Sequence, residues 1–155
     1  MDLDLELVAT HDKPALLALS TVEWLATAKA SLKEIGYKVH TAGSHEDFVV
    51  RFGRVNYQVV ITEELFAANT IADNYSLQYL RELPMNRRRH AVSFLIATEA
   101  QTLNPMQAFQ VSMHAVINPA ELSQLQPVVQ QVVANHDMFM KSYRDAEARI
   151  AQLAI

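Results

Sequence analysis

Residues 59–66 have the sequence VVITEELF. Its first four residues are apolar or β-branched, which is typical of a buried strand, and two carboxylates, Glu63 and Glu64, follow at once. In open α/β sheets, residues at the carboxyl ends of the strands stand where ligands bind and chemistry occurs. The stretch therefore predicts a buried strand and makes Glu63 the first candidate site residue.

Segments with strand and helix patterns alternate on both sides of this stretch. Strands are expected at 15–19, 37–42, 57–62, 91–98 and 114–118, and helices at 22–35, 45–54, 75–83, 105–113 and from about 123 to the end. This order predicts an α/β domain with a five-stranded parallel sheet, doubly wound as (βα)5, and an extended C-terminal helix. We expect residues 1–13 to form an N-terminal arm, an edge strand or a frayed tail, residues 14–135 the domain, and residues 136–155 a C-terminal helical extension.

Composition excludes several classes of function. The chain has 155 residues, a formal net charge of −4 and no cysteine. It therefore has no general attraction to nucleic acid or anionic membranes, and it has no disulfide, thiolate nucleophile or zinc-thiolate site. The acidic N-terminus does not resemble a signal peptide, and no apolar run approaches the ~18 residues of a membrane span. We expect a cytoplasmic protein with no nucleic-acid or membrane partner.

Several phrases, taken in order, resemble the receiver domain of bacterial response regulators, a family with the flavodoxin-like fold of the chemotaxis response regulator. LKEIGYKVHTAGSHEDF (residues 32–48) resembles a receiver's first helix, second strand and second helix, and NYQVVIT (residues 56–62) its third strand. NPAEL (residues 118–122) resembles the Lys-Pro turn after its fifth strand. The resemblance covers roughly residues 14–135 and implies a signalling domain that binds protein partners.

The resemblance also implies where a phosphorylation site would stand, and most of its residues are replaced. The two magnesium-binding acids after the first strand correspond to Ser20 and Thr21, and the phosphoacceptor aspartate to Glu63. The switch aromatic corresponds to Ala115 and the conserved lysine to Asn118, whereas the hydroxyl after the fourth strand is kept as Thr98. Magnesium prefers carboxylate oxygens, so two hydroxyls are poor substitutes. We expect no catalytic residue, no metal and no cofactor.

Two interpretations of Glu63 remain open in the sequence. Its extra methylene misplaces the carboxylate, and a misplacement of ~1 Å can cost phosphoryl transfer about 10²-fold. Glu63 either mimics the phosphorylated state, with hydrogen bonds toward Thr98 and Asn118, or is a solvated acid without a role. In both cases the sequence predicts a phosphorylation-independent pseudo-receiver that is not an enzyme.

Other candidate sites are weaker. A small-ligand or nucleotide binder on the same flavodoxin-like sheet is the alternative function, because Ser20 and Thr21 could hold an oxyanion at a helix start. The basic run 87–89 is interpreted as a solvated loop, and the six histidines show no zinc-binding spacing. Trp24 and Phe109 are expected in the core.

The C-terminal helix carries a heptad seam. Apolar residues follow at steps of three and four from Leu125 to Leu153, interrupted by His136. Pro127 requires the helix to begin between Glu121 and Gln126. The seam predicts a homodimer, parallel or antiparallel, with these interface residues: Phe139, Tyr143, Ile150 and Leu153. Its protein partners in signal transduction are not identified by the sequence.

Overall fold

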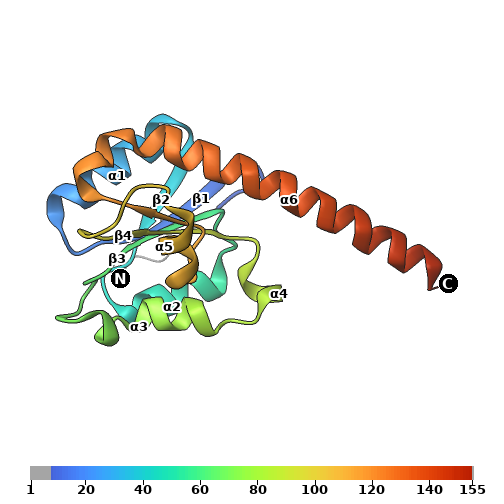
Figure 1. The fold of residues 1–155 in the computed structure, drawn as a ribbon, viewed down its shortest axis with the longest axis horizontal. Helices are drawn as coiled ribbons and strands as arrows, with labels where there is room; N and C mark the ends of the chain where they lie inside the picture. Colours follow the sequence, from blue (N-terminus) through green and yellow to red (C-terminus); the bar gives the residue numbers. More distant parts are fainter. Residues whose placement is uncertain (1–7, 155) are drawn as a thin grey trace.

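The computed structural model describes residues 8–154 and contains one five-stranded parallel sheet with the order β2-β1-β3-β4-β5 (Figure 1). The strands are β1 (Lys13–Ala18), β2 (Tyr37–Thr41), β3 (Val59–Glu63), β4 (Val92–Ile96) and β5 (Ala115–Ile117). Every strand pair is parallel, and β1 lies between β2 and β3. The predicted fold class is confirmed.

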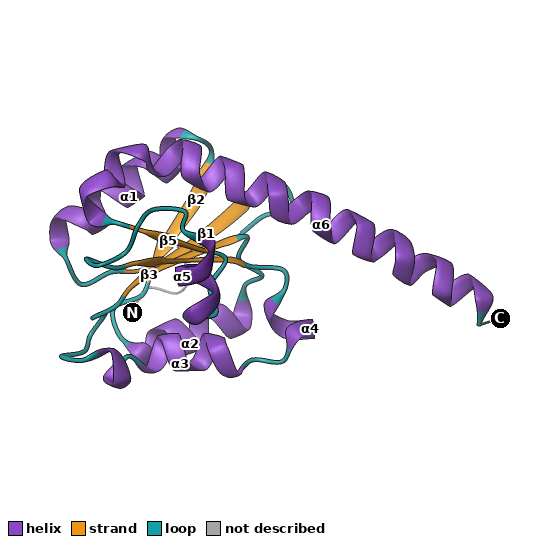
Figure 2. Cartoon of the chain, in the orientation of Figure 1, coloured by secondary structure: helices purple, strands orange, loops and turns teal. Residues whose placement is uncertain are grey.

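Helices connect the strands and cover both faces of the sheet (Figure 2). The α-helices are α1 (Val22–Glu34), α2 (His45–Arg54), α3 (Tyr75–Glu82), α4 (Met85–Arg88), α5 (Pro105–Gln110) and α6 (Leu125–Leu153), and the 3-10 helices are η2 (Ile71–Asp73) and η3 (Pro119–Gln124). Helices α1 and α6 lie on one face and α2 and α3 on the other, with α5 beside β5 (Figure 1).

Alternating side chains of each strand supply two separate cores. In β1, Ala15 and Leu17 face the core under α1 and α6, whereas Leu16 and Ala18 face the core under α2 and α3. Both sets are fully buried, as expected for a central parallel strand whose two faces are covered. The short apolar run that predicted the first strand therefore reflects burial on both sides.

Local sequence signals account for several element ends. Gly36 follows α1 with a φ of 94°, a left-handed conformation that glycine adopts without strain. Ser44 accepts a hydrogen bond from the backbone N–H of Asp47 at 3.0 Å and so caps α2. Helix α6 begins at Leu125, within the predicted interval, and Pro127 lies in its first turn.

Three expectations differ from the structure. The helix expected at 105–113 ends at Gln110, because Ser112 adopts a φ of 58° and turns the chain toward β5. Phe109, expected in the core, is 80% exposed. The boundary expected after Asn135 falls inside the continuous helix α6, and Met140 is still buried, so packing on the domain extends beyond that residue.

Helix α6 projects well beyond the sheet (Figure 1). It has 29 residues and is therefore ~43 Å long at 1.5 Å per residue. Its buried residues all lie between Leu125 and Met140. No helix in the described part of the chain combines the length and apolarity that crossing a membrane requires. The expected arm at residues 1–13 lies largely outside the described residues, and the described part forms a turn in which Asp12 N–H donates to Ala9 O at 3.0 Å.

Candidate functional site

The candidate site lies at the carboxyl edge of the sheet, where β1, β3, β4 and β5 end. Glu63 is the last residue of β3, and Ser20 and Thr21 join β1 to α1. Thr98 follows β4 and Asn118 follows β5. The parallel topology brings these chain-distant residues to one edge, as the resemblance predicts.

Glu63 is buried and binds the start of α1. Only 4% of the residue is exposed. One carboxylate oxygen, Oε1, accepts hydrogen bonds from the backbone N–H groups of Ser20 and Thr21, the latter at 2.7 Å. The other, Oε2, accepts a hydrogen bond from Thr21 Oγ1 at 2.9 Å. Thr21 is the N-cap of α1, so the negative charge also lies at the positive end of a 13-residue helix.

This geometry matches neither interpretation left open by the sequence. Glu63 is not a solvated acid, because it is buried with three donors around its carboxylate. Its carboxylate contacts lie on Ser20 and Thr21 rather than on Thr98 and Asn118. Glu63 is better described as an internal anion that occupies the helix terminus opposite its own strand.

The residues around Glu63 do not fit magnesium. Mg²⁺ requires several oxygen ligands in near-octahedral geometry. Here Ser20 and Thr21 present hydrogen-bond donors to the carboxylate, and Ser20 Oγ accepts from the backbone N–H of Ala67 at 2.8 Å. Within residues 8–154, no cluster of three or more His, Asp or Glu side chains could hold a metal.

Thr98 and Asn118 serve the loops around the site. The backbone N–H of Thr98 donates to Glu64 Oε1 at 3.2 Å. Asn118 Nδ2 donates to the carbonyl oxygens of Thr98 at 3.2 Å and Ala100 at 2.8 Å, and its Oδ1 accepts from Ala120 N–H at 2.9 Å. The amide of Asn118 thus holds two loops together, where a lysine would present a mobile cation. Ala115 is buried at the start of β5.

Asn74 is a site residue that the sequence analysis missed. This fully buried side chain donates from Nδ2 to the carbonyl oxygens of Glu63 at 2.9 Å and Glu64 at 3.1 Å. Its Oδ1 accepts from Leu77 N–H at 3.1 Å and caps α3. An asparagine directly before the helical pattern YSLQYL was the available signal, since Asn is a preferred N-cap.

His45 also fixes the long loop after β3. Its Nδ1 lies 2.8 Å from Ser76 Oγ and its Nε2 lies 3.2 Å from Ala67 O. The ring packs edge-on against Phe66 and Tyr75. Together with Ser20 and Asn74, His45 anchors residues 64–74 at several points.

The predicted interface residues of α6 fall into two groups. Phe139, Ile150 and Leu153 are largely exposed large apolar side chains. Tyr143 instead meets its own domain, because Arg89 lies over its ring at 4.6 Å and hydrogen bonds to its hydroxyl group. His136 Nε2 similarly lies 2.8 Å from Arg89 O. The seam thus touches the domain through Tyr143 and is free beyond it.

The basic run 87–89 is only partly the solvated loop expected. Arg87 is exposed, but Arg88 donates to the carbonyl oxygen of Ser112 and Arg89 contacts α6. Burial, and then nearby Arg81, lowers the pKa of Arg88. The run therefore ties the α4 turn to α6 and to the turn that precedes β5.

Comparison with solved structures identifies the fold. A receiver domain protein of Methanospirillum hungatei has a TM-score of 0.63 at 13% identity, covering 82% of this chain and 98% of that one. The receiver domain of a Pseudomonas aeruginosa sensor histidine kinase, solved with magnesium in its active-site cleft, has a TM-score of 0.61 at 18% identity, covering 79% and 98%. A chemotaxis response regulator of Vibrio cholerae has a TM-score of 0.56 at 17% identity, covering 76% and 98%.

The chain therefore has the receiver-domain fold, as the sequence phrases predicted. No protein-family model matches the sequence, and no curated protein matches it significantly.

Proposed function

We propose that this protein is a phosphorylation-independent pseudo-receiver that acts as a non-catalytic interaction module in cytoplasmic signal transduction of the two-component type. The observation that carries the proposal is the buried carboxylate of Glu63, whose oxygens already accept three hydrogen bonds. A phosphoryl group on this side chain would have to displace those bonds and would meet neither a magnesium site nor a lysine.

Radiolabelled acetyl phosphate tests this proposal. With magnesium present, the protein should remain unlabelled, while an unrelated active receiver in the same reaction should be labelled. The Glu63→Gln variant controls for labelling elsewhere on the chain. A label that depends on Glu63, and that is stable in acid but lost in base as expected for an acyl phosphate, would contradict the proposal.

The alternative, a nucleotide or small-ligand binder at the carboxyl edge, gains no support from the site geometry. The Ser20 and Thr21 N–H groups that would hold a phosphate donate to Glu63 instead. An external anion would have to expel a buried carboxylate that belongs to the same chain.

We further propose that the interaction module is a homodimer formed through α6. The exposed side chains of Phe139, Ile150 and Leu153 lie on one stripe of a helix that extends past its domain. A solvated stripe of this kind is stabilised when a second helix covers it. Protein partners would then bind a two-domain assembly.

Light scattering tests the dimer. The wild-type chain should be dimeric at tens of micromolar, and Ile150→Ser combined with Leu153→Ser should make it monomeric without loss of folding. Val22→Ser is the matched control, because Val22 is equally exposed but lies on α1. A wild-type monomer at this concentration would contradict the dimer.

A further inference from the structure

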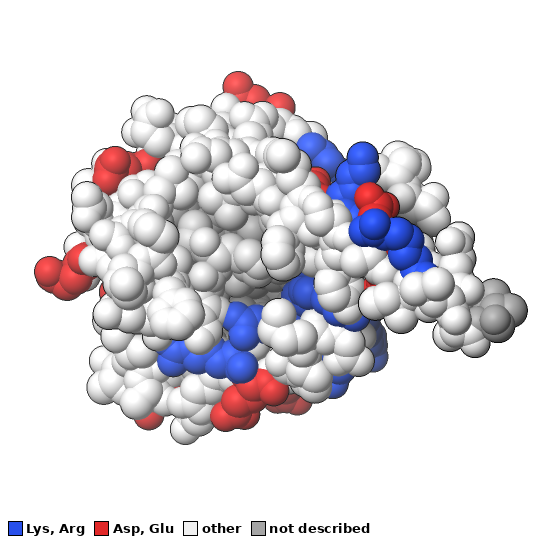
Figure 3. Space-filling view, turned by 45° about the vertical axis from the view of Figure 1, so that its right-hand side comes forward, with Lys and Arg blue, Asp and Glu red and all other residues white. Residues whose placement is uncertain are grey.

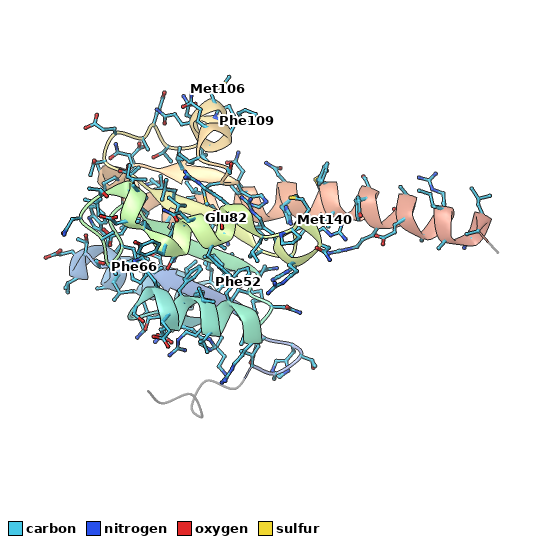
Figure 4. The ribbon with its side chains drawn as sticks, turned by 90° about the horizontal axis from the view of Figure 1, so that it is seen from below. Phe52, Phe66, Glu82, Met106, Phe109 and Met140 are labelled. Carbon is cyan, nitrogen blue, oxygen red and sulfur yellow. The ribbon has the colours of Figure 1, made fainter. Side chains whose placement is uncertain are left out.

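A groove of about 1090 Å³ lies beside α6, at the edge of the sheet opposite Glu63. Its lining includes Arg88 and Arg89, just before β4, and Met113 and His114, just before β5. Helix α5 forms one wall and α6 the other, and Figure 4 shows Phe109 and Met140 on these two helices. In Figure 3 the surface is hollowed beside α6, with lysine and arginine atoms along the rim.

The heptad seam of α6 runs directly into this groove. Val132, His136, Phe139 and Tyr143 are successive seam residues, and all four line it. The same seam continues past Tyr143 to Ile150 and Leu153, where the helix no longer contacts its own domain. A helix that pairs along the free part of the seam is therefore directed into the groove.

Steric constraints favour one orientation of such a pair. In an antiparallel pair, the segment that enters the groove is the end of α6, a bare helix ~10–12 Å across. In a parallel pair, the segment that enters the groove is the first half of α6. The walls of its own groove stand beside that segment and would collide with the other copy. Phe109, 80% exposed on α5, stands on that wall.

We propose that two copies of this chain pair with their α6 helices antiparallel, so that the last turns of each α6 occupy the groove of the other copy. The proposal rests on the proposed dimer and assigns its geometry. Symmetry requires that each contact occurs twice, with the two residues exchanged. A heptad pairing that sets Tyr143 opposite Ala146 also sets Phe139 opposite Ile150, and His136 opposite Leu153.

Charges agree with this register. Among the described residues, no carboxylate forms an ion pair with Arg88 or Arg89, although both line the groove. Glu147 adjoins Ala146, so in the pair it lies near Tyr143 of the other copy and within reach of the Arg89 that stacks there. The apolar floor and the basic rim of the groove thus both receive a matching side chain.

Site-directed cross-linking tests the geometry, because the chain contains no cysteine of its own. Phe139→Cys and Ile150→Cys are placed on separate chains that differ by an affinity tag and are co-expressed. In the antiparallel pair, the same position in the two chains is separated by eleven residues, or ~17 Å, along the helix axis. A disulfide requires Cα atoms within about 7 Å. We expect a covalent heterodimer from the mixture and at least tenfold less covalent dimer from either variant alone.

Other outcomes overturn the inference in distinguishable ways. If each variant alone forms as much covalent dimer as the mixture, the helices are parallel. The dimer then stands and the antiparallel geometry fails. If light scattering shows a dimer but no sample forms a cross-link, the interface lies elsewhere and the antiparallel geometry is refuted. A wild-type chain that light scattering shows to be monomeric at tens of micromolar refutes the proposed dimer itself.

Discussion

The backbone N–H of Thr21 donates a hydrogen bond to the carboxylate of Glu63 at 2.7 Å, joining the start of α1 to the end of β3. In the receiver correspondence that the sequence predicts, Thr21 takes the place of a magnesium-binding acid and Glu63 takes the place of the phosphoacceptor. The direct contact of these two residues links the start of α1 to the end of β3. We propose that the two replacements are complementary to each other, so that this edge of the sheet keeps its structure without phosphorylation chemistry.

Glu63→Gln should lower the free energy of unfolding by about 1–3 kcal/mol, because it removes charge-assisted hydrogen bonds from a buried group. Chemical denaturation at neutral pH measures the change. Glu64→Gln is the matched control, since Glu64 is more exposed and accepts one N–H bond, from Thr98 at 3.2 Å. The control should change stability by less than about 0.5 kcal/mol. Equal effects of the two substitutions would show that the contacts of Glu63 contribute little.

Asn74→Ala should be more destabilising than the loss of an ordinary helix cap. The substitution removes the α3 cap and leaves the carbonyl oxygens of Glu63 and Glu64 without the amide that binds them. We expect a loss of about 2–4 kcal/mol from the combined cap and buried hydrogen bonds. Asn104→Ala is the control, because Asn104 caps α5 through one bond to Gln107 N–H at 3.0 Å. A loss no larger than in this control would contradict the structural role of Asn74.

Acid should destabilise the fold partly through His40, one of three histidines whose pKa burial lowers. Burial, and then Lys38, lowers the pKa of His40 below its ordinary value of 6.5. Its ring is 2% exposed, and Nδ1 lies 2.7 Å from Tyr57 Oη. Below about pH 6.5 the unfolded chain therefore binds a proton that the folded chain does not, so stability falls as the pH decreases.

Denaturant unfolding at pH 7.5 and 5.5 measures this effect. The loss between the two pH values should be smaller in His40→Gln than in the wild type. The control is His11→Gln, because the His11 side chain is 85% exposed. An unchanged pH dependence in the His40 variant would assign the acid sensitivity to other groups.

The sequence predicts the sheet well because the strands and the helix ends have local sequence signals. Buried strands such as 59–63 and helix stops such as Gly36 carry local signals. The contacts of Glu63 were not predictable in this way, because they depend on how closely the loop after β1 approaches the end of β3. The exposure of Phe109 was missed for a related reason: the helical pattern places it on an apolar face, but α5 buries the adjacent Ala108 and leaves Phe109 exposed.

Truncation separates the packing of α6 on its domain from the dimerisation that we propose for it. A chain that ends at Arg144 keeps Met140, the contact of His136 with Arg89 and the stacking of Arg89 on Tyr143. It should be a folded monomer by light scattering, with a melting temperature close to that of the wild type at low concentration.

A chain that ends at Asn135 should also be monomeric but less stable, because it loses these three contacts with the domain. Thermal unfolding by circular dichroism compares the two truncated chains. Equal stability would show that residues 136–144 contribute no packing to the domain.

The most direct test of the phosphorylation-independent account is a backbone NMR titration with beryllofluoride and magnesium, which together imitate the phosphorylated state of a receiver. Since the carboxylate of Glu63 is already bound by Ser20 and Thr21, we expect the amide signals of residues 20–21, 63–64, 98 and 118 to stay unchanged. A magnesium-dependent shift of these signals, saturating with beryllofluoride, would show that the site still accepts a phosphoryl group and would contradict the account.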